Sequence, residues 1–274
     1  MSFEFRFVRG GEAVKVDEKL IRSCGFEVKP DSMPSPEEMQ RLKKAAGAGV
    51  DVFCVPSQFI PKLALFDMDS TIVAAETLDE MAEMAGYGAE VKEITRQAMV
   101  EGADFDTSLR RRLVKLKGVD AGSLLQPVYE DMKLNEGAEV LIQGLKDHGV
   151  KIVLVSGGFT FFTEKVSSRL NMDAHHGNVL EIDDEGLLTG RVINDADIVN
   201  GNKKAEHLAY YAQQYGADLS ECLCVGDGSN DLPMMKKAGL GVGYRPAPGG
   251  KVEQEMSNVI RDGNLATLLK VIGF

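Results

Sequence analysis

The stretch LALFDMDSTIV, residues 63–73, decides the fold and places the candidate site. Leu63 to Phe66 form a short, continuous hydrophobic run, which is typical of a strand buried on both faces of a parallel sheet. In sheets of this kind, ligands bind beyond the carboxyl ends of the strands, where Asp67 and Asp69 stand. Residues two apart in an extended chain project to the same side, so both carboxylates are expected to face one pocket. Two carboxylates held close together favour a bound cation or a retained proton.

The composition is that of an ordinary globular protein. At 274 residues, with 44% hydrophobic and 27% charged residues, the chain suits one domain with an insertion, or one large and one small domain. The net charge of −11 argues against nucleic acid or an anionic membrane as a partner, because a polyanion needs a basic surface. A small anionic substrate is compatible with it, because a metal ion, one lysine and helix N-termini can hold a phosphate in an acidic protein.

The four cysteines show neither C-x-x-C spacing nor the density of a disulfide scaffold. We interpret them as buried free thiols in a reducing compartment. The amino-terminal MSFEFRFVRG lacks the regions of a signal peptide, and no apolar stretch approaches the length of about 18 residues that a membrane span requires. These features predict a cytoplasmic protein with no membrane partner.

Residues 1–61 are expected to form a small α/β segment. Strand-like patterns occur at FEFRFVR near the start, at FEVK (26–29) and at VDVFCV (50–55). Ser35 is a good N-cap, and Glu38 is placed to close a capping box with it. No chemical constellation occurs in this segment. We favour a packing appendage, and the alternative is a regulatory role or one in forming a homodimer.

A helical insertion is expected at about residues 75–132, because no convincing strand pattern occurs there. The segment ADFDTSLRRRLVKL carries an apolar stripe with helical spacing, formed by Phe105, Leu109, Leu113 and Leu116. Arg112 follows Leu109 by three residues, which places it beside this stripe. An arginine there either extends to solvent or reaches into a cleft.

From Glu136 onward, helix and strand patterns alternate, which predicts a parallel sheet with helices on both faces. The expected elements are strands at KIVLV (151–155), CLCV (222–225) and GLGVGY (239–244), and a hairpin turn at 183–190. We therefore expect an α/β fold whose core, residues 62–274, is a Rossmann-like doubly wound parallel sheet. His175 and His176 have no partner at metal-ligand spacing, so we interpret them as a surface turn.

Polar, glycine-bearing loops follow three of the buried strands: DMDST, SGGF and GDGSND. Right-handed crossovers would bring these strand ends to the same edge of the sheet. Asp67 and Asp227 offer the hard oxygen ligands that magnesium prefers. The glycines beside Asp227 allow a tight turn that aims it inward, and Asn230 and Asp231 suit either a helix cap or support of the metal.

Groups that suit a phosphate lie in the same loops. Ser156 offers a hydroxyl, and Gly157 offers a backbone N–H at the expected start of a helix. Lys204, which precedes the apolar stripe of a later helix, supplies a positive charge for a phosphoryl group in transfer. Taken alone, a serine such as Ser156 is more often a helix cap than a phosphate ligand, and Lys203 is the alternative to Lys204.

With these motifs in order, the chain resembles the haloacid dehalogenase superfamily of phosphohydrolases. That superfamily is marked by D-x-D-x-T, a serine or threonine after the second strand, a downstream lysine and an acidic loop, here DMDST, Ser156, Lys204 and GDGSND. Longer strings are similar to the phosphoserine phosphatases within it: DMDST with Glu76 beyond it, FDTSLRRR (105–112), SGGFTFF (156–162) and GDGSNDLPM (226–234). The resemblance covers residues 62 to about 270 and leaves the amino-terminal segment outside.

The resemblance implies a magnesium-dependent phosphatase that works through an aspartyl phosphate. Asp67 would be the nucleophile, and Asp69 would protonate the leaving oxygen and then activate water. One Mg²⁺ ion would be held by Asp67, the backbone carbonyl of Asp69, and Asp227. The substrate-binding residues implied on the core side are Ser156, Gly157, Lys204 and Asn230.

The resemblance also implies that the helical insertion is a cap that selects the substrate. Arg112 would bind the carboxylate of phosphoserine, and Glu76 would bind its ammonium group. The implied reaction is hydrolysis of O-phospho-L-serine to L-serine and phosphate, the last step of serine biosynthesis. The alternatives are a phosphatase of the same fold for another substrate, phosphoryl transfer to an acceptor such as homoserine, and an inactive core used as a binding or regulatory module.

Overall fold

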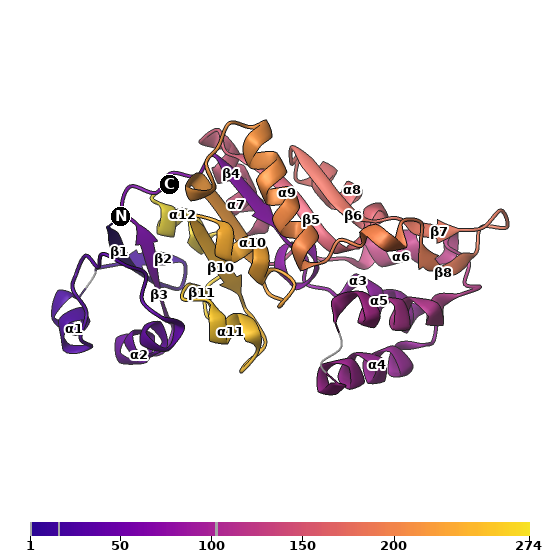
Figure 1. Ribbon diagram of the computed structural model, residues 1–274, viewed down its shortest axis with the longest axis horizontal. Coiled ribbons are helices and arrows are strands. Elements are labelled where there is room, and N and C mark those ends of the chain that lie inside the picture. Colours follow the sequence, from indigo (N-terminus) through magenta and orange to yellow (C-terminus); the bar gives the residue numbers. More distant parts are fainter. Residues whose placement is uncertain (1, 16, 102–103) are drawn as a thin grey trace.

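A computed structural model describes residues 2–15, 17–101 and 104–274 of the chain. In chain order the elements are β1 (Phe3–Arg9), β2 (Glu12–Val14), α1 (Glu18–Ser23), α2 (Pro36–Ala46), β3 (Val50–Pro56), β4 (Leu63–Phe66), α3 (Thr77–Met84), α4 (Gly88–Glu101), α5 (Phe105–Leu113), α6 (Gly122–Asp131), α7 (Ala138–Asp147), β5 (Lys151–Phe159), α8 (Thr160–Arg169), β6 (Ala174–Asn178), β7 (Leu180–Ile182), β8 (Leu188–Val192), α9 (Gly201–Gln214), β9 (Cys222–Gly226), α10 (Leu232–Lys237), β10 (Leu240–Tyr244), α11 (Lys251–Glu255), β11 (Val259–Ile260) and α12 (Thr267–Ile272). Figure 1 shows an elongated molecule, with β1–β3 toward one end and α3–α5 toward the other. No helix in the described ranges is both long enough and apolar enough to cross a membrane.

The central sheet has six strands in the order β11-β10-β9-β4-β5-β6, and every neighbouring pair is parallel. Strand β4 pairs with both β5 and β9 and is completely buried, as its unbroken apolar sequence requires. The chain continues from β4 to β5 on one side and reaches β9 on the other only later. Such a switch point opens a crevice at the carboxyl ends of the strands. The expected α/β class and doubly wound parallel sheet are confirmed.

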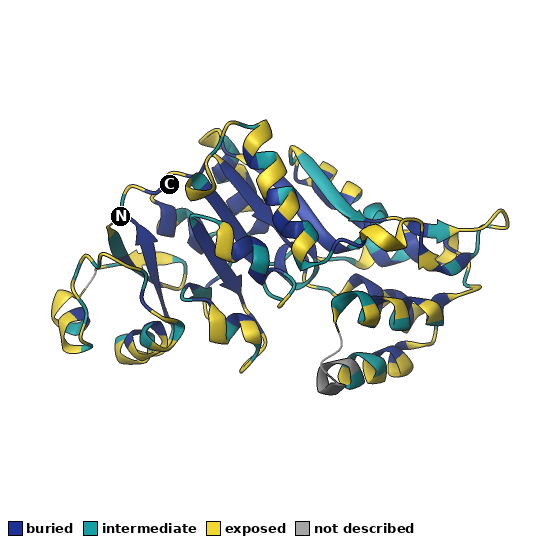
Figure 2. Ribbon diagram, in the orientation of Figure 1, coloured by how far each residue is buried: buried dark blue, intermediate teal, exposed yellow. Residues whose placement is uncertain are grey.

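Alternate side chains of the sheet belong to two separate cores. Leu63 and Leu65 of β4 pack with α9, α10 and α11, whereas Ala64 and Phe66 pack with α7, α8 and α12. The strand period of two residues produces this division. Figure 2 shows the consequence: the central strands are buried, and the helices on both faces turn exposed residues outward. The sheet is therefore a rigid platform for the loops at its edge.

The segment between β4 and β5 contains α3, α4, α5 and α6, as its lack of strand patterns predicts. Helix α5 begins after Asp104, whose side chain accepts the N–H of Thr107 at 2.7 Å. Leu109 and Leu113 of its apolar stripe are buried. The β7–β8 hairpin, predicted around residues 183–190, packs against the residues that follow α5.

Two polar pairs tie α5 to the segment that leads into α9. The Asn200 amide donates to both oxygens of Asp106, at 3.1 and 3.2 Å, and the Arg110 side chain donates to Asp195 at 2.8 Å. Asn200 also accepts the N–H of Lys203 at 3.1 Å, which caps α9. The insertion is therefore anchored to the start of the helix that carries Lys204.

The amino-terminal strands form a separate antiparallel sheet in the order β2-β1-β3. One face of this sheet is covered by α1 and α2, and the other face packs on the core through Val8, Phe53 and Val55. Helix α2 begins with the predicted capping box between Ser35 and Glu38.

Side chains join this small sheet to the loops around β11. The Asn258 amide accepts the N–H of Cys54 at 2.8 Å and donates to its carbonyl oxygen at 3.0 Å. Asp51 accepts backbone N–H groups from three successive residues, Arg261 (3.1 Å), Asp262 (3.2 Å) and Gly263 (2.9 Å). Asn258 and Asp51 are both buried, where such hydrogen bonds are strong. They fix the amino-terminal sheet against the core.

The predicted strand at residues 26–29 is wrong. Helix α1 precedes it, and the N–H of Phe26 donates to the carbonyl oxygen of Ile21 at the end of that helix. Gly25, with a φ of 88°, makes this reversal possible. The N–H of Phe26 donates at the end of a helix, so it is not available for a hydrogen bond in a sheet.

The predicted surface turn at His175 and His176 is also wrong. Both residues lie in the edge strand β6 and are half-buried. His175 shares a hydrogen bond with the Thr163 hydroxyl (3.0 Å), and His176 shares one with the Tyr211 hydroxyl (2.8 Å). An edge strand with polar partners on its neighbouring helices does not need an apolar alternation.

Candidate active site

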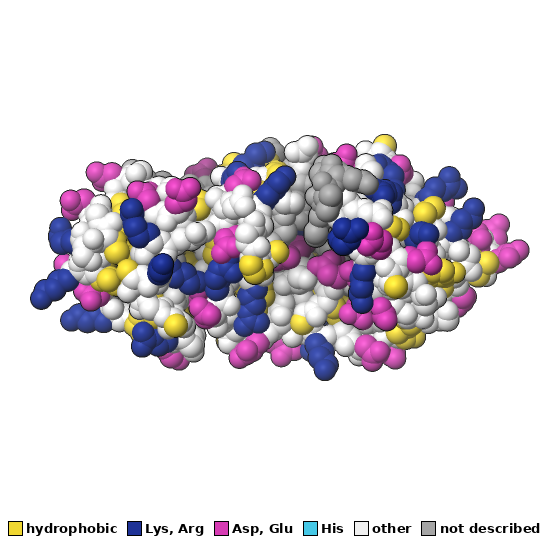
Figure 3. All heavy atoms as spheres, turned by 90° about the horizontal axis from the view of Figure 1, so that it is seen from below, with side chains coloured by type: hydrophobic (Ala, Val, Ile, Leu, Met, Phe, Trp, Pro, Cys, Tyr) yellow, Lys and Arg dark blue, Asp and Glu magenta, His cyan; other side chains and the backbone are white. Residues whose placement is uncertain are grey.

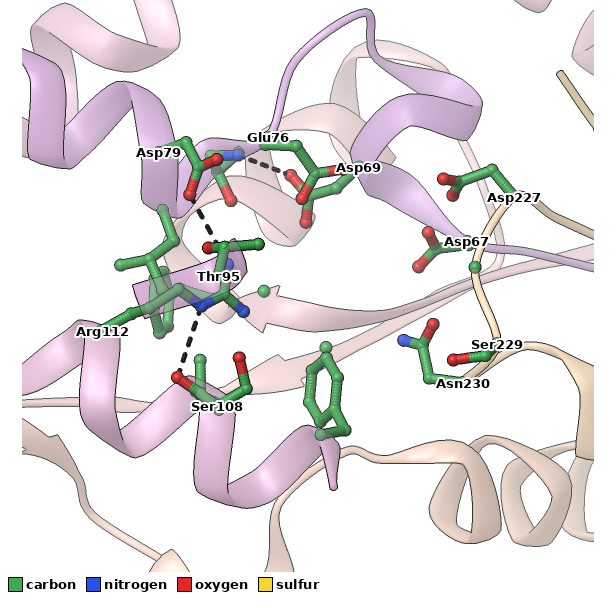
Figure 4. A pocket seen from close by; sticks show the side chains of 18 of the residues that line it. Asp67, Asp69, Glu76, Asp79, Thr95, Ser108, Arg112, Asp227, Ser229 and Asn230 are labelled. Carbon is green, nitrogen blue, oxygen red and sulfur yellow. Dashed lines mark hydrogen bonds and ion pairs between the residues drawn. The ribbon is translucent and has the colours of Figure 1, made fainter. Parts of the chain in front are cut away.

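The loops after β4 and β9 and the end of β5 converge under α3, α4 and α5 and enclose a cavity of about 460 Å³. Acidic side chains gather in the hollow at the middle of the molecule in Figure 3. Figure 4 shows the cavity from close by, with Asp67 and Asp227 at one end, which we call the core end. Arg112 and Asp79 stand at the opposite end, which we call the cap end.

Lys204 is the central positive charge of the core end. It is fully buried in α9, and its Nζ donates to Asp67 Oδ1 at 2.5 Å and to Asp231 Oδ1 at 2.6 Å. Burial alone would lower the pKa of Lys204, but the two carboxylates outweigh it and raise the pKa above its usual value. Lys204 is therefore protonated. Its neighbour Lys203 pairs instead with Glu206, away from the cavity.

Three carboxylates, from Asp67, Asp227 and Asp231, offer oxygens that lie within 4.8 Å of one another. Burial, and then the charge of Asp231, raises the pKa of Asp227 to about 8. Burial likewise raises the pKa of Asp67. The Thr71 hydroxyl donates to Asp227 at 3.3 Å and helps to orient it. Because Lys204 is one positive charge among three carboxylates, this set of hard oxygen donors fits a divalent cation.

Asp69 faces the same cavity as Asp67, while Met68 between them is fully buried. One oxygen of Asp69 accepts the N–H of Thr77 at 2.9 Å, and the other accepts the Ser156 hydroxyl at 3.1 Å. Burial raises the pKa of Asp69, although these hydrogen bonds oppose the rise. A carboxyl group whose pKa is raised is suited to carry a proton as a general acid.

The turn that carries this pair is strained at Ser70, whose φ of 55° is left-handed. The Asn135 amide lies against the turn and donates to the carbonyl oxygens of Ser70 (3.1 Å), Thr71 (2.9 Å) and Val73 (3.1 Å). The Ser70 hydroxyl in turn donates to Glu76 at 2.6 Å. Strain that the surroundings hold in place is common at functional sites.

Glu76 stands where this turn enters α3, on the wall of the cavity. Its side chain faces the open space, but the surrounding protein displaces much of the bulk water. This burial, and then the charge of Asp69, raises the pKa of Glu76 to about 7, although Arg112 opposes the rise. The position therefore favours a ligand that brings a positive charge, such as an ammonium group.

Arg112 reaches the cavity from α5, with a side chain that is 12% exposed. Its Nη1 lies 3.5 Å from Asp79 Oδ1, and its Nε lies 3.4 Å from the carbonyl oxygen of Ser108. Both distances are long for hydrogen bonds. The planar guanidinium thus keeps most of its donors available, which suits a carboxylate ligand.

The carboxyl-terminal residues of β5 bring backbone groups to the cavity wall. The fully buried Ser156 hydroxyl accepts the N–H of Gly158 at 2.8 Å. Gly157 lines the cavity. The sequence predicts it at the start of a helix, which is wrong, because β5 continues to Phe159 before α8 begins. A Cβ atom on Gly157 would lie 2.3 Å from the Phe105 ring, so a glycine here makes room for the ring of Phe105, the first residue of α5, over the end of β5.

Comparisons with known proteins agree with this geometry. The family model described as haloacid dehalogenase-like hydrolase matches residues 64–236, more than half of the chain. The chain belongs to this family. A phosphoserine phosphatase from Polaromonas sp. is 44% identical to it over 214 residues, which are 77% of this chain and 89% of that protein.

Two solved structures of the family cover the fold. A HAD family hydrolase from Salmonella enterica serovar Typhi superposes with a TM-score of 0.83 at 27% identity, covering 99% of this chain and 98% of that one. A phosphoserine phosphatase solved as an analogue of the phospho-aspartyl intermediate superposes with a TM-score of 0.70 at 37% identity. It covers 77% of this chain and 99% of its own. The predicted membership of the haloacid dehalogenase superfamily is confirmed.

The cavity wall brings together most of the residues that the family resemblance singles out: Asp67, Asp69, Glu76, Arg112, Gly157, Asp227 and Asn230. Ser156 and Lys204 lie buried behind the wall and reach it through their hydrogen bonds to Asp69 and Asp67.

Two acidic residues of this hydrolase have contacts that the sequence analysis does not anticipate. Asp231, expected to cap a helix or support a metal, makes no capping bond and instead accepts hydrogen bonds from Lys204 and from the N–H of Gly228 (3.0 Å). Asp79 lines the cap end and was not singled out. Its spacing of three residues from Glu76 in a helical segment was the available signal, because residues so spaced share a helix face.

Proposed function

We propose that this hydrolase is a phosphoserine phosphatase, which converts O-phospho-L-serine and water to L-serine and phosphate. The distribution of charge along the cavity carries the proposal. Asp67 and Asp69 stand toward the core end, and Glu76 and Arg112 offer one negative and one positive group toward the cap. Phosphoserine has a phosphate at one end and an ammonium and a carboxylate at the other, so its charges complement the cavity. The similarity to phosphoserine phosphatases supports the same conclusion.

In the proposed first step, a carboxylate oxygen of Asp67 attacks phosphorus, and the bond between phosphorus and the serine oxygen breaks. Asp69 gives its proton to the departing oxygen, so serine leaves with its hydroxyl group restored. Asp69, now ionised, takes a proton from a water molecule whose oxygen attacks the phosphorus of the aspartyl phosphate. The bond to Asp67 breaks, phosphate leaves, and Asp69 is protonated again.

The buried groups around Asp67 prepare it for this step. Lys204 holds one oxygen of Asp67 and leaves the other to attack. We assign Ser156, Gly157 and Asn230 to the oxygens of the substrate's phosphate, because they offer donors at or just behind the cavity wall. Mg²⁺ bound by Asp67, the backbone carbonyl of Asp69, and Asp227 would offset the negative charge of the transferring phosphoryl group.

The cap end would choose the substrate. Arg112 would bind the carboxylate of phosphoserine, because most N–H donors of its guanidinium are free of short hydrogen bonds. Glu76, whose pKa is raised by burial and then by the charge of Asp69, would bind the ammonium group. Helix α5, packed over the end of β5, would shield the reaction from bulk water.

The wider setting follows from the same proposal. We divide the chain into an amino-terminal segment (1–61) and a phosphatase core (62–274) with a cap insertion at about 75–132. The reaction would be the last step of serine biosynthesis. A cytoplasmic location is supported by the cysteines, since all four lie within the described residues and are free thiols. Light scattering tests for a homodimer.

The deciding experiment measures phosphate release from O-phospho-L-serine, with and without Mg²⁺, beside sugar phosphates, a phosphopeptide and homoserine as an added acceptor. We expect Mg²⁺-dependent release of serine and phosphate in equal amounts, with the highest kcat/KM for phosphoserine. A higher kcat/KM for another ester would overturn the substrate assignment. Phosphohomoserine as the main product would replace hydrolysis by transfer.

A further inference from the structure

Asp79 is a carboxylate in the cavity to which the proposed mechanism gives no task. It lies in the first turn of α3, three residues after Glu76, and its side chain is 27% exposed. Residues at this spacing share one side of a helix, so Asp79 faces the cavity beside Glu76. In Figure 4 it approaches the Arg112 guanidinium from one side, and Ser108 approaches from the other.

The contact between Asp79 and Arg112 is an ion pair without a good hydrogen bond. The oxygen of Asp79 that lies 3.5 Å from Arg112 is buried, and within the described chain it has no hydrogen-bond partner. The other polar contact of Arg112 in the described residues is the long one to the Ser108 carbonyl. The Arg112 side chain is 12% exposed, and within the described residues Asp79 is the carboxylate that lies in ion-pair contact with its guanidinium.

Such an arrangement suits a guanidinium that must bind a ligand later. Arginine has a long side chain with many rotamers, and a free one would have to be ordered each time a ligand binds. A hydrogen-bonded pair with a neighbouring carboxylate would order the arginine, but it would occupy the two parallel N–H donors of the guanidinium that a substrate carboxylate needs. Charge attraction at 3.5 Å orders the side chain and leaves these donors free.

We propose that Asp79 is a positioning residue for substrate recognition: it orients Arg112 toward the carboxylate of the substrate and leaves the hydrogen-bond donors of the Arg112 guanidinium free. The inference rests on the proposed phosphoserine phosphatase activity. A different role is open to the same carboxylate, because Asp79 beside Glu76 would also suit direct contact with the substrate's ammonium group. The two roles predict different responses to substrates that lack one of these groups.

The test compares the wild-type chain with Asp79→Asn, which keeps the size of the side chain and removes its charge. Glu80→Gln is the matched control, because it removes the same charge from the next residue of α3, which is exposed. The substrates are O-phosphoserine and phosphoethanolamine, which keeps the ammonium group and lacks the carboxylate. An inhibition constant replaces KM for phosphoethanolamine if turnover is slow.

We expect Asp79→Asn to raise KM for phosphoserine about tenfold, with kcat changed by less than about threefold, and to leave phosphoethanolamine unaffected. In an Arg112→Ala background, Asp79→Asn should have no further effect on phosphoserine, because the group it positions is absent. Glu80→Gln should leave both substrates unchanged.

Other outcomes overturn the inference in distinct ways. Equal weakening of both substrates would make Asp79 an ammonium contact or a purely structural residue. A lower KM for phosphoserine would mean that Asp79 only repels the substrate's carboxylate. A further loss in the Arg112→Ala background would show that Asp79 acts independently of Arg112. Failure of the wild-type chain to hydrolyse phosphoserine would instead overturn the proposed function on which the inference rests.

Discussion

The two ends of the cavity are held by different kinds of interaction. At the core end, the buried Lys204 makes hydrogen bonds of 2.5 and 2.6 Å to two carboxylates. At the cap end, the polar contacts of Arg112 within the described chain are 3.4 and 3.5 Å long. The core end is already ordered, as groups that stabilise a transition state should be. The cap end keeps its donors for a ligand.

This difference follows from the elements that carry the two ends. Asp67 and Asp227 follow strands whose side chains are completely buried between two layers of helices. Arg112 and Asp79 belong to separate short helices, α5 and α3, which meet above the sheet. Rigid placement suits the chemical step, and a site formed between two packed helices suits recognition of the substrate. We therefore expect changes at the core end to affect kcat and stability, and changes at the cap end to affect KM.

The largest effect should come from Asp67→Asn, which removes the proposed nucleophile. We expect kcat for phosphoserine to fall at least about a thousandfold, even with Mg²⁺ present. The melting temperature should not fall, because one of three crowded carboxylates has lost its charge. Steady-state assays and thermal unfolding measure both quantities. Activity near that of the wild type would remove Asp67 as the nucleophile and with it the contrast between the two ends.

The next effect should come from Lys204→Met at the core end. The change leaves Asp67 and Asp231 buried without their shared cation, which should lower the free energy of unfolding by about 3–5 kcal/mol. Urea unfolding without added metal measures the loss. Lys203→Met is the matched control, because surface ion pairs contribute only about 0–1 kcal/mol. Equal losses in the two variants would mean that the buried network does not stabilise the core end.

Arg112→Ala tests the cap end directly. We expect KM for phosphoserine to rise about a hundredfold, because a charge-assisted contact with its carboxylate is lost. A neutral aryl phosphate, which has no carboxylate, should show little change in KM. Measuring both substrates separates recognition from chemistry. Equal changes in KM for the two would remove Arg112 from substrate recognition.

The smallest effect concerns pH and Mg²⁺ at the core end. The pKa of Asp227 is raised to about 8 by burial and then by Asp231, so the folded protein holds a proton that the unfolded chain releases near pH 4. Without a cation, the stability from this group is complete below pH 4 and is lost as pH rises toward 8. Mg²⁺ binds the ionised form, so saturating Mg²⁺ should raise the melting temperature more at pH 8 than at pH 6, by roughly 5 °C.

Thermal unfolding with Mg²⁺ and with a chelator, at both pH values, measures this difference. Asp227→Asn, which cannot ionise, is the control and should show the same small response to Mg²⁺ at each pH. An equal rise at both pH values in the unchanged chain would mean that the cation does not depend on ionisation of Asp227.

Features that depend on one buried strand could be predicted from the sequence. The apolar side chains of the run LALF can all be buried only between two helical layers, and this places Asp67 and Asp69 at the edge of the sheet where the strands end. The loop after β9 followed by the same reasoning, whereas Ser156 and Gly157, expected in a loop, lie in the last residues of β5. Ser35 and Glu38 likewise fixed a helix start through local hydrogen bonds alone. Each of these signals lies within a few residues of the feature that it predicts.

Features that depend on the meeting of distant segments could not be predicted. Asp231 accepts a hydrogen bond from Lys204, 27 residues earlier, and no local pattern indicates that pairing. The pairing of Asp79 with Arg112 depends on how α3 and α5 pack. The two histidines of strand β6 find hydrogen-bond partners in Thr163 and Tyr211 on neighbouring helices, so they gave no strand signal in the sequence. The segment at 26–29 had a strand pattern but no free backbone donor at Phe26.

The amide of Asn258 has a consequence for how the protein behaves at high concentration. Strand β11 is the last strand of the central sheet, and an uncovered sheet edge is a template for pairing with another molecule. The two hydrogen bonds between the Asn258 amide and the backbone of Cys54 hold the amino-terminal sheet beside that edge. Residues 1–61 would thus guard against aggregation, and a chain lacking them would keep its cavity residues but risk self-association through the uncovered strand.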